Sequence, residues 1–140
     1  MKQLFENQFQ TIYLHENLDV FEQRFKSDSQ NIFGEAYIKE MRIFGDYMNT
    51  HQTPDKKISK IIINTLDGGP TMEPSVQKWM HDIFYPQISE NGIKSKAYCM
   101  GEEIVAKLSI ELTAEDDPNA MFKFQFFSSL EDGINWLSAI

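Results

Sequence analysis

The sequence has a single cysteine, Cys99, so an internal disulfide is excluded. It also has no apolar run near the roughly 20 residues that a membrane-spanning helix needs. Residues 1–6 lack the apolar core of a signal peptide. We therefore expect a cytoplasmic protein without membrane contact, and the lone thiol agrees with a reducing compartment.

Basic residues are also in short supply. Thirteen Lys and Arg stand against 21 Asp and Glu, which gives a net charge of -8 at pH 7. This excess of acidic residues disfavours nucleic acid and anionic membrane surfaces as partners, because both are negatively charged themselves. It favours solubility, and it leaves open a basic protein partner or a second copy of the chain in a homodimer.

Glycine and proline, with seven and five residues, form no low-complexity linker, and no repeat of solenoid period is present. A chain of 140 residues with 41% hydrophobic content is long enough for one domain with a substantial core. It is too short for two such domains. We predict one domain over residues 1–140.

What the sequence does contain is an uninterrupted β-branched run, Ile61, Ile62 and Ile63, within residues 57–67. Successive side chains of a strand point to opposite faces, so a strand that is apolar on both faces must be covered on both. Asp-Gly-Gly-Pro at residues 67–70 then breaks the chain. The run predicts a central strand of a parallel or mixed sheet, with helices packed against it.

The remaining elements follow from their apolar periodicity. Alternation with a period of two predicts strands, the first two of which form a β-hairpin, and stripes at spacings of three and four predict amphipathic helices. An acidic surface loop is expected at residues 113–119. The predicted strands are residues 10–15, 20–25, 57–67, 94–100 and 121–127. Each predicted helix carries one apolar stripe. In chain order these stripes are Tyr37, Met41, Phe44 and Met48; Val76, Trp79, Met80, Ile83 and Phe84; Ile104, Leu108 and Leu112; and Leu130, Ile134 and Leu137.

Two details mark where the helices begin and end. Residues 27–31 offer several N-cap side chains ahead of the first helix, and Ser129 with Asp132 forms a capping-box spacing ahead of the last. Pro74 suits a first helical turn, whereas Pro86 is expected to kink or end the regular part of the same helix.

The predicted order β-β-α-β-α-β-α-β-α describes an α/β fold, with a five-stranded, mostly parallel mixed sheet and about four helices. This order resembles the STAS fold of bacterial anti-sigma-factor antagonists and, more closely, the small STAS-like proteins of unknown function. The residues that carry the resemblance are 61–67, 77–79, 86–92 and 124–136. The resemblance implies a non-enzymatic protein-interaction or regulatory module.

The sequence departs from the antagonist pattern at one position. In that family the loop after the central strand ends in an Asp-Ser pair whose serine is phosphorylated, whereas here Asp67 precedes Gly68. Thr71 and Ser75 are the nearest hydroxyls, and their phosphorylation stays open. Capping of the following helix explains Ser75 equally well.

Open α/β sheets bind their ligands at the carboxyl ends of the strands, which here are residues 65–75 and 101–103. We expect these two loops to lie side by side. The acids Glu73, Glu102 and Glu103 oppose phosphate or nucleotide binding there. We predict a docking face for a protein partner, whose residues are Asp67, Thr71, Glu73, Ser75 and Glu102. The alternative is that Asp67 and Ser75 merely stabilise a turn and a helix start.

Other chemical interpretations are weaker. His15, His51 and His81 lack metal-ligand spacing, and Cys99, in apolar company, is expected to be a buried thiol. We predict no metal, no cofactor and no catalytic residue. The stripe of Phe122, Phe124 and Phe126 belongs either to the core or to a lipid-sized cavity.

Three functions follow in order of preference. The first is the interaction module, and the second is a carrier of a small molecule or lipid in an internal apolar cavity. An enzyme comes third, because no convergent nucleophile and base can be assembled from the sequence.

Overall fold

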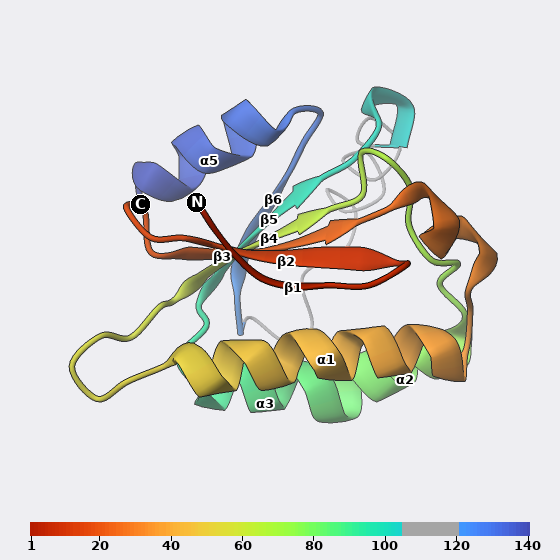
Figure 1. Cartoon of the computed structure of the whole chain (residues 1–140), viewed down its shortest axis with the longest axis horizontal. Helices are drawn as coiled ribbons and strands as arrows, with labels where there is room; N and C mark the ends of the chain where they lie inside the picture. Colours follow the sequence, from red (N-terminus) through yellow and green to blue (C-terminus); the bar gives the residue numbers. More distant parts are fainter. Residues whose placement is uncertain (105–120) are drawn as a thin grey trace.

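The computed structural model describes residues 1–104 and 121–140 of the chain. They form an α/β fold in three layers, in which a mixed sheet separates α1, α2 and α3 from α5 (Figure 1). The described strands lie in sequence order across the sheet: β1 (Lys2–Glu6), β2 (Gln10–His15), β3 (Val20–Phe25), β4 (Lys60–Asn64), β5 (Ser95–Cys99) and β6 (Lys123–Phe127).

The strand directions agree with the predicted mixed sheet. β1 with β2 and β2 with β3 are antiparallel, and the second of these pairs is the predicted hairpin. β3 with β4, β4 with β5 and β5 with β6 are parallel. The carboxyl ends of β3 to β6 therefore meet at one edge of the sheet.

β4 is the predicted central strand, covered on both faces. Ile61 belongs to the larger core beneath α1 and the α2–α3 helix, while Ile62 belongs to a smaller core beneath α5. Both side chains are almost fully buried. The β-branched run thus occupies the position that its two-sided hydrophobicity requires.

The predicted count of five strands is wrong, because β1 adds a sixth. β1 is an edge strand with exposed residues at both ends, and only Leu4 and Phe5 pack against the core. Its register on β2 shifts between Gln3 and Phe5. An irregular, half-exposed edge strand lacks the periodicity by which strands are recognised in a sequence.

α1 (Glu35–His51) buries the predicted stripe of Tyr37, Met41, Phe44 and Met48. Its start is later than expected, since residues 27–31 form the short 3-10 helix η1 (Ser27–Asn31) instead of a cap. The N-cap is Gly34, at φ 56 and ψ -129. Glycine adopts this backbone conformation readily, whereas residues with a Cβ are strained there.

The second helix is continuous through α2 (Pro74–Trp79), the π-helical segment η2 (Met80–Phe84) and α3 (Tyr85–Glu90). Pro74 lies in its first turn, as predicted. Pro86 neither ends nor breaks the helix, contrary to one of the two expectations. The wide turn precedes Pro86, whose missing N–H and bulky ring are incompatible with regular α-helical bonding to the preceding turn.

The remaining helices also begin where predicted. Residues 102–104 are helical, whereas Leu108, Leu112 and the predicted loop at 113–119 lie outside the described residues. α5 (Leu130–Ser138) has the predicted cap, in which the Asp132 amide donates to the Ser129 Oγ at 3.2 Å. Within the described part of the chain, no helix is long and apolar enough to cross a membrane.

Candidate functional site

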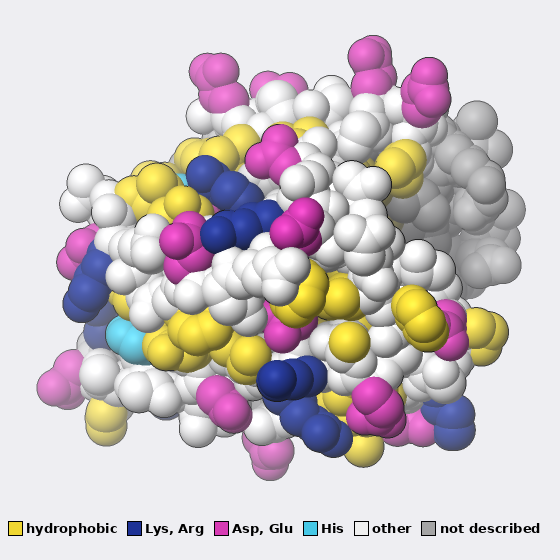
Figure 2. Space-filling model, turned by 45° about the vertical axis from the view of Figure 1, so that its right-hand side comes forward, with side chains coloured by type: hydrophobic (Ala, Val, Ile, Leu, Met, Phe, Trp, Pro, Cys, Tyr) yellow, Lys and Arg dark blue, Asp and Glu magenta, His cyan; other side chains and the backbone are white. Residues whose placement is uncertain are grey.

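The loops that follow β4 and β5 meet at the carboxyl edge of the sheet, as predicted. They line a hollow of about 730 Å³, which we call the outer hollow. Figure 2 brings this side of the molecule forward, and it shows hydrophobic side chains interspersed with acidic and basic ones. The described residues that line the outer hollow are Gln30, Tyr37, Ile63, residues 65–70, Met72, Tyr98, Met100, Gly101, Ile104 and Phe126.

Backbone hydrogen bonds hold the first of these loops in place. The Thr65 amide donates to the Cys99 carbonyl at 2.8 Å, which ties the ends of β4 and β5 together. The Leu66 amide donates to the Asn64 side chain at 3.0 Å, and the Gly68 amide donates to the Thr65 carbonyl at 3.3 Å. The rim of the outer hollow is therefore built on the strand ends themselves.

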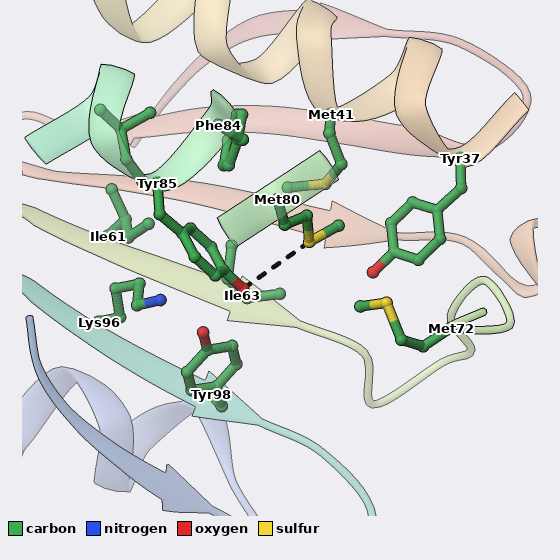
Figure 3. Close-up of a pocket in the computed structure, with 11 residues that line it drawn as sticks. Tyr37, Met41, Ile61, Ile63, Met72, Met80, Phe84, Tyr85, Lys96 and Tyr98 are labelled. Carbon is green, nitrogen blue, oxygen red and sulfur yellow. Dashed lines mark hydrogen bonds between the residues drawn. The ribbon is translucent and has the colours of Figure 1, made fainter. Parts of the chain in front are cut away.

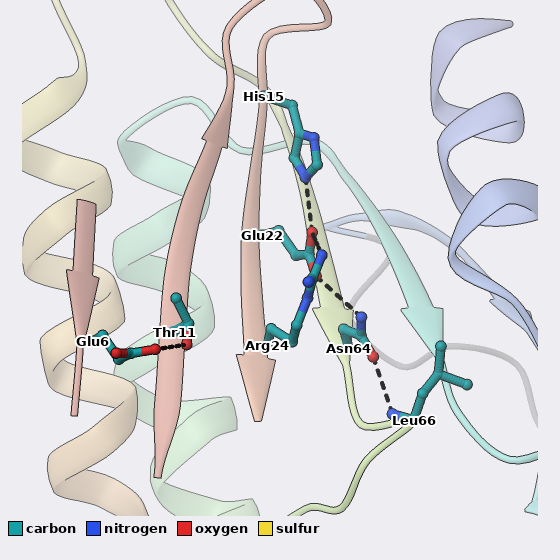
Figure 4. Close-up of polar contacts among 7 residues, drawn as sticks. All are labelled: Glu6, Thr11, His15, Glu22, Arg24, Asn64 and Leu66. Atoms are coloured by element: carbon teal, nitrogen blue, oxygen red, sulfur yellow. Dashed lines mark hydrogen bonds and ion pairs between the residues drawn. The ribbon is translucent and has the colours of Figure 1, made fainter. Parts of the chain in front are cut away.

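Asn64 also connects this loop to a buried polar network on the α5 face of the sheet (Figure 4). Its amide donates to Glu22 Oε2 at 3.0 Å, while Arg24 Nε lies 2.6 Å from Oε2 and His15 Nε2 lies 2.8 Å from Oε1. Burial alone would raise the pKa of Glu22, but the hydrogen bonds from His15, Arg24 and Asn64 outweigh burial and lower it. Glu22 is thus a buried, satisfied carboxylate.

A second and smaller space, the inner cavity, lies between the sheet and the helices α1 to α3 and has a volume of about 60 Å³ (Figure 3). It adjoins the outer hollow, because Tyr37, Ile63, Met72 and Tyr98 line both. The other residues that line the inner cavity are Met41, Ile61, Met80, Phe84, Tyr85, Ile88 and Lys96.

The π-helical segment shapes the wall of the inner cavity. Met80 and Phe84 are the first and last residues of η2, Tyr85 follows it directly, and all three line the cavity. The Tyr85 hydroxyl donates to Met80 Sδ at 3.7 Å (Figure 3). Single π turns within α-helices occur often at functional sites, where they redirect side chains that a regular helix would spread over two faces.

Lys96 is the only basic residue among the described residues that line the inner cavity. It lies in the interior strand β5, and only 5% of its surface is exposed. Its Nζ is 3.9 Å from the ring centroid of Tyr85, 4.3 Å from that of Phe122 and 5.2 Å from that of Tyr98. These rings stabilise the buried ammonium through cation–π interactions.

Two hydroxyls accompany this cation. Figure 3 shows the Tyr85 hydroxyl, the Lys96 ammonium and the Tyr98 hydroxyl pointing toward a common part of the cavity. Tyr98 is held by Phe126, whose ring stacks on it at 5.2 Å, and by Phe124 at 6.4 Å. The inner cavity thus combines apolar walls with a small convergent polar group, the usual composition of a small-molecule site.

The predicted docking residues are dispersed around this edge. Asp67 lines the outer hollow, Thr71 and Glu102 are exposed, and Glu73 is half-buried as the N-cap residue of α2. Ser75 is exposed in the first turn of α2, and the N-cap is Glu73, so the capping interpretation of Ser75 is wrong. The docking role of these five residues stays a prediction.

The predicted buried thiol is confirmed. Cys99 is fully buried on the α5 face, and burial, with Glu22 and Asp132 nearby, raises the pKa of its thiol to about 12. No group of three or more His, Cys, Asp or Glu side chains that could hold a metal ion occurs in the described residues.

The aromatic stripe of Phe122, Phe124 and Phe126 borders the outer hollow and covers Lys96. Phe126 lines the outer hollow, and Phe122 covers Lys96, so part of the stripe borders a cavity. The site residues predicted from the sequence did not include Lys96, Tyr98 and Tyr85. A signal was present, because alternation along residues 94–100 places Lys96 and Tyr98 together on the face opposite Cys99, and a lysine on a covered face of an interior strand is unusual.

Comparisons with protein-family models, with curated proteins and with solved structures found no match for this chain.

Proposed function

We propose that this protein binds a small apolar molecule in the inner cavity and outer hollow, as a non-enzymatic carrier or ligand-responsive module. The observation that carries the proposal is the placement of a buried ammonium and two tyrosine hydroxyls in the wall of a cavity whose other described lining residues are mainly apolar. Apolar walls that carry a few convergent polar groups are the usual composition of a small-molecule site.

The dimensions of the site support a ligand of modest size. The outer hollow, at about 730 Å³, falls within the range of roughly 300–1,000 Å³ that is usual for small-molecule pockets. Met41, Met72 and Met80 line the inner cavity. Methionine side chains are flexible and polarizable, so they adapt to apolar ligands of different shape.

The position of Cys99 favours a binding function over a catalytic one, because cysteine has the most nucleophilic side chain. Cys99 lies in the core beneath α5, on the sheet face opposite the inner cavity, and its raised pKa keeps the thiol protonated. Burial also raises the pKa of Tyr37, which lines both spaces. Its hydroxyl therefore stays neutral.

The test is titration of the protein with decanol, a neutral amphiphile, by isothermal calorimetry. We expect saturable binding by the natural sequence and a loss of affinity of about tenfold or more in Ile63→Phe, which narrows the junction of the two spaces. Met72→Trp obstructs the same junction from a half-exposed loop position. It replaces Ile63→Phe in the titration if that variant does not fold.

The control is Ile140→Phe, the same substitution at an exposed position at the end of the chain. It should bind decanol as the natural sequence does. Absence of saturable binding by the natural sequence, or equal binding by the natural sequence and both obstructed variants, contradicts the proposal.

A second candidate is the STAS-like interaction module, and a specific observation favours it. Leu66, Met72 and Ile104 are 38%, 46% and 53% exposed at the rim of the outer hollow, close in sequence to the acids at 67, 73 and 102. Exposed apolar side chains with polar residues around them are typical of protein interfaces.

This docking face is tested by charge reversal. Glu73→Lys with Glu102→Lys should weaken capture of a basic partner and reduce its sensitivity to salt, because exposed charges attract over about 10 Å at 0.1 M salt. An unchanged set of captured proteins with unchanged salt sensitivity rules out the face. Sedimentation of the same variant tests whether a second copy of the chain is the partner.

A further inference from the structure

We infer that the ligand of this site is a neutral carbonyl compound with apolar groups on both sides of the carbonyl, whose oxygen accepts a hydrogen bond from the Tyr37 hydroxyl. This inference rests on the proposed small-molecule binding and names the chemical class of the ligand. It follows from the position of Tyr37, from the scarcity of acceptors in the inner cavity and from the charges around the site.

Tyr37 presents to the cavity a hydroxyl that no described residue uses. It lies in the first turn of α1, and only 9% of its surface is exposed. Figure 3 shows its hydroxyl directed toward the space that Met72 and Met80 border. The ring is held edge-on against Phe25 at 6.2 Å, but the hydroxyl has no hydrogen-bond partner among the residues that the structure describes. A ligand oxygen can therefore accept its proton in a hydrogen bond.

The other polar groups in the wall of the inner cavity are already engaged. The Tyr85 hydroxyl donates to Met80 Sδ at 3.7 Å. The Lys96 ammonium lies over the rings of Tyr85 and Phe122. Tyr37 is thus the group that recognises the polar part of the ligand.

The inner cavity has more donors than strong acceptors. None of its described lining side chains is a carboxylate or an amide, and the polar ones are hydroxyls, an ammonium and thioethers. A carbonyl oxygen only accepts, so a single donor satisfies it. The O–H of an alcohol also brings a donor, and a buried donor without an acceptor costs free energy. This composition favours a ketone over an alcohol.

The position of Tyr37 places the carbonyl within the ligand and not at its end. Tyr37, Ile63 and Met72 line both spaces, so a carbonyl bonded to Tyr37 lies near their junction. One apolar group then enters the inner cavity of about 60 Å³, and a larger one lies in the outer hollow of about 730 Å³. A ketone with a small and a large apolar substituent matches these unequal spaces.

The charges around the site favour a neutral ligand. Asp67 lines the outer hollow and Glu102 is exposed at the same edge, so both repel an anion there. Lys96 repels a cation at the inner cavity. The Tyr37 hydroxyl is itself neutral, because burial raises its pKa, and it offers no countercharge to a buried ion.

The experiment compares butyrophenone with butylbenzene by calorimetry at pH 7, because the two molecules share a carbon skeleton and differ by the carbonyl oxygen. Tyr37→Phe removes only the hydroxyl. It should weaken butyrophenone binding about fivefold, the usual effect of one lost hydrogen bond, and leave butylbenzene binding unchanged. Because the hydroxyl has no partner in the described structure, the variant should not be less stable in denaturant unfolding.

The matched control is Tyr47→Phe, the same substitution at a half-buried position of α1 that lines neither space. It should leave the binding of both molecules unchanged. Infrared spectroscopy supplies a second measurement without a variant. The carbonyl stretch of bound butyrophenone should lie at lower frequency than in hexane, because hydrogen bonding weakens the C=O bond.

Three results overturn the inference. They are an equal change in the affinity for both molecules in Tyr37→Phe, a carbonyl stretch at the hexane frequency, and failure of butyrophenone to bind a protein that binds decanol or butylbenzene. Failure of decanol, butyrophenone and butylbenzene alike to bind overturns the proposed function itself.

Discussion

At the scale of single residues, two buried charges are treated differently by the fold. Glu22 is satisfied by a network of His15, Arg24 and Asn64 and holds the sheet together on the α5 face. Lys96 lies against aromatic rings at the edge of a cavity. The first arrangement suits a structural role, and the second places a cation in the wall of the inner cavity.

Glu22 should make the stability of the protein depend on pH. Its pKa is lower in the folded protein than the ordinary value of 4.5, so its stabilising contribution is complete above about pH 4.5 and is lost as the pH falls through the folded pKa. We expect denaturant unfolding between pH 7 and pH 3 to show a steeper loss of stability for the natural sequence than for Glu22→Gln. At pH 7 the variant should be less stable by about 3 kcal/mol, as is typical when one partner of a buried ion pair is removed.

Glu6→Gln is the control for this measurement. Glu6 also has a lowered pKa, chiefly because of its contact with Lys26, but its carboxylate is exposed. Its replacement should change the pH dependence little. If the stability of the natural sequence and that of Glu22→Gln fell equally steeply from pH 7 to pH 3, the network would not control the loss of stability at low pH.

At the scale of secondary-structure elements, the seating of α5 depends on a glycine. A Cβ added at Gly133 would lie 2.8 Å from Cys99 Sγ and 3.5 Å from the Ala97 Cβ, closer to the sulfur than packing allows. The absence of a side chain therefore lets α5 approach β5. The same approach covers the Cys99 thiol.

Gly133→Ala tests this packing, because the expected change in stability is a loss, whereas helix propensity alone would give a gain. Alanine favours a helix over glycine by about 1 kcal/mol, yet we expect a net loss of about 1–2 kcal/mol because α5 must shift. Labelling of Cys99 by Ellman's reagent, slow in the natural sequence, should become faster. Cys99→Ala should offset part of the loss in the double variant, because it removes the clashing sulfur.

Asn135→Ala is the matched control, since it adds an alanine at an exposed position of α5. It should leave stability equal or slightly higher and leave the thiol shielded. A Gly133→Ala protein as stable as Asn135→Ala, with slow labelling, would contradict the close approach of α5.

At the scale of the whole molecule, the sequence predicts the framework better than the site. The run Ile61 to Ile63 identified the central strand because burial on both faces needs hydrophobic residues at successive positions. The spacing of Ser129 and Asp132 identified the start of α5 because capping is a local interaction. The meeting of two loops at the sheet edge followed from the topology of parallel strands.

Other features depend on contacts distant in the sequence. β1 exists because β2 offers it an edge, and the π turn before Pro86 is one of several outcomes that a proline in a helix allows. The surroundings of Lys96 combine rings from α3, β5 and the residue before β6. No local pattern predicts such a combination, although the inward position of Lys96 within its strand could have been recognised.

The most direct test of the central claim, ligand binding between the sheet and α1 to α3, is a titration followed through methionine methyl groups by NMR. The chain has seven methionines, of which Met41, Met72 and Met80 line the inner cavity. Met48 is buried away from it, and Met1 is exposed. With ¹³C-methyl methionine, decanol should shift the signals of Met41, Met72 and Met80 saturably and leave those of Met1 and Met48 in place. Unchanged signals of the three cavity methionines at a decanol concentration near its solubility limit would contradict the account.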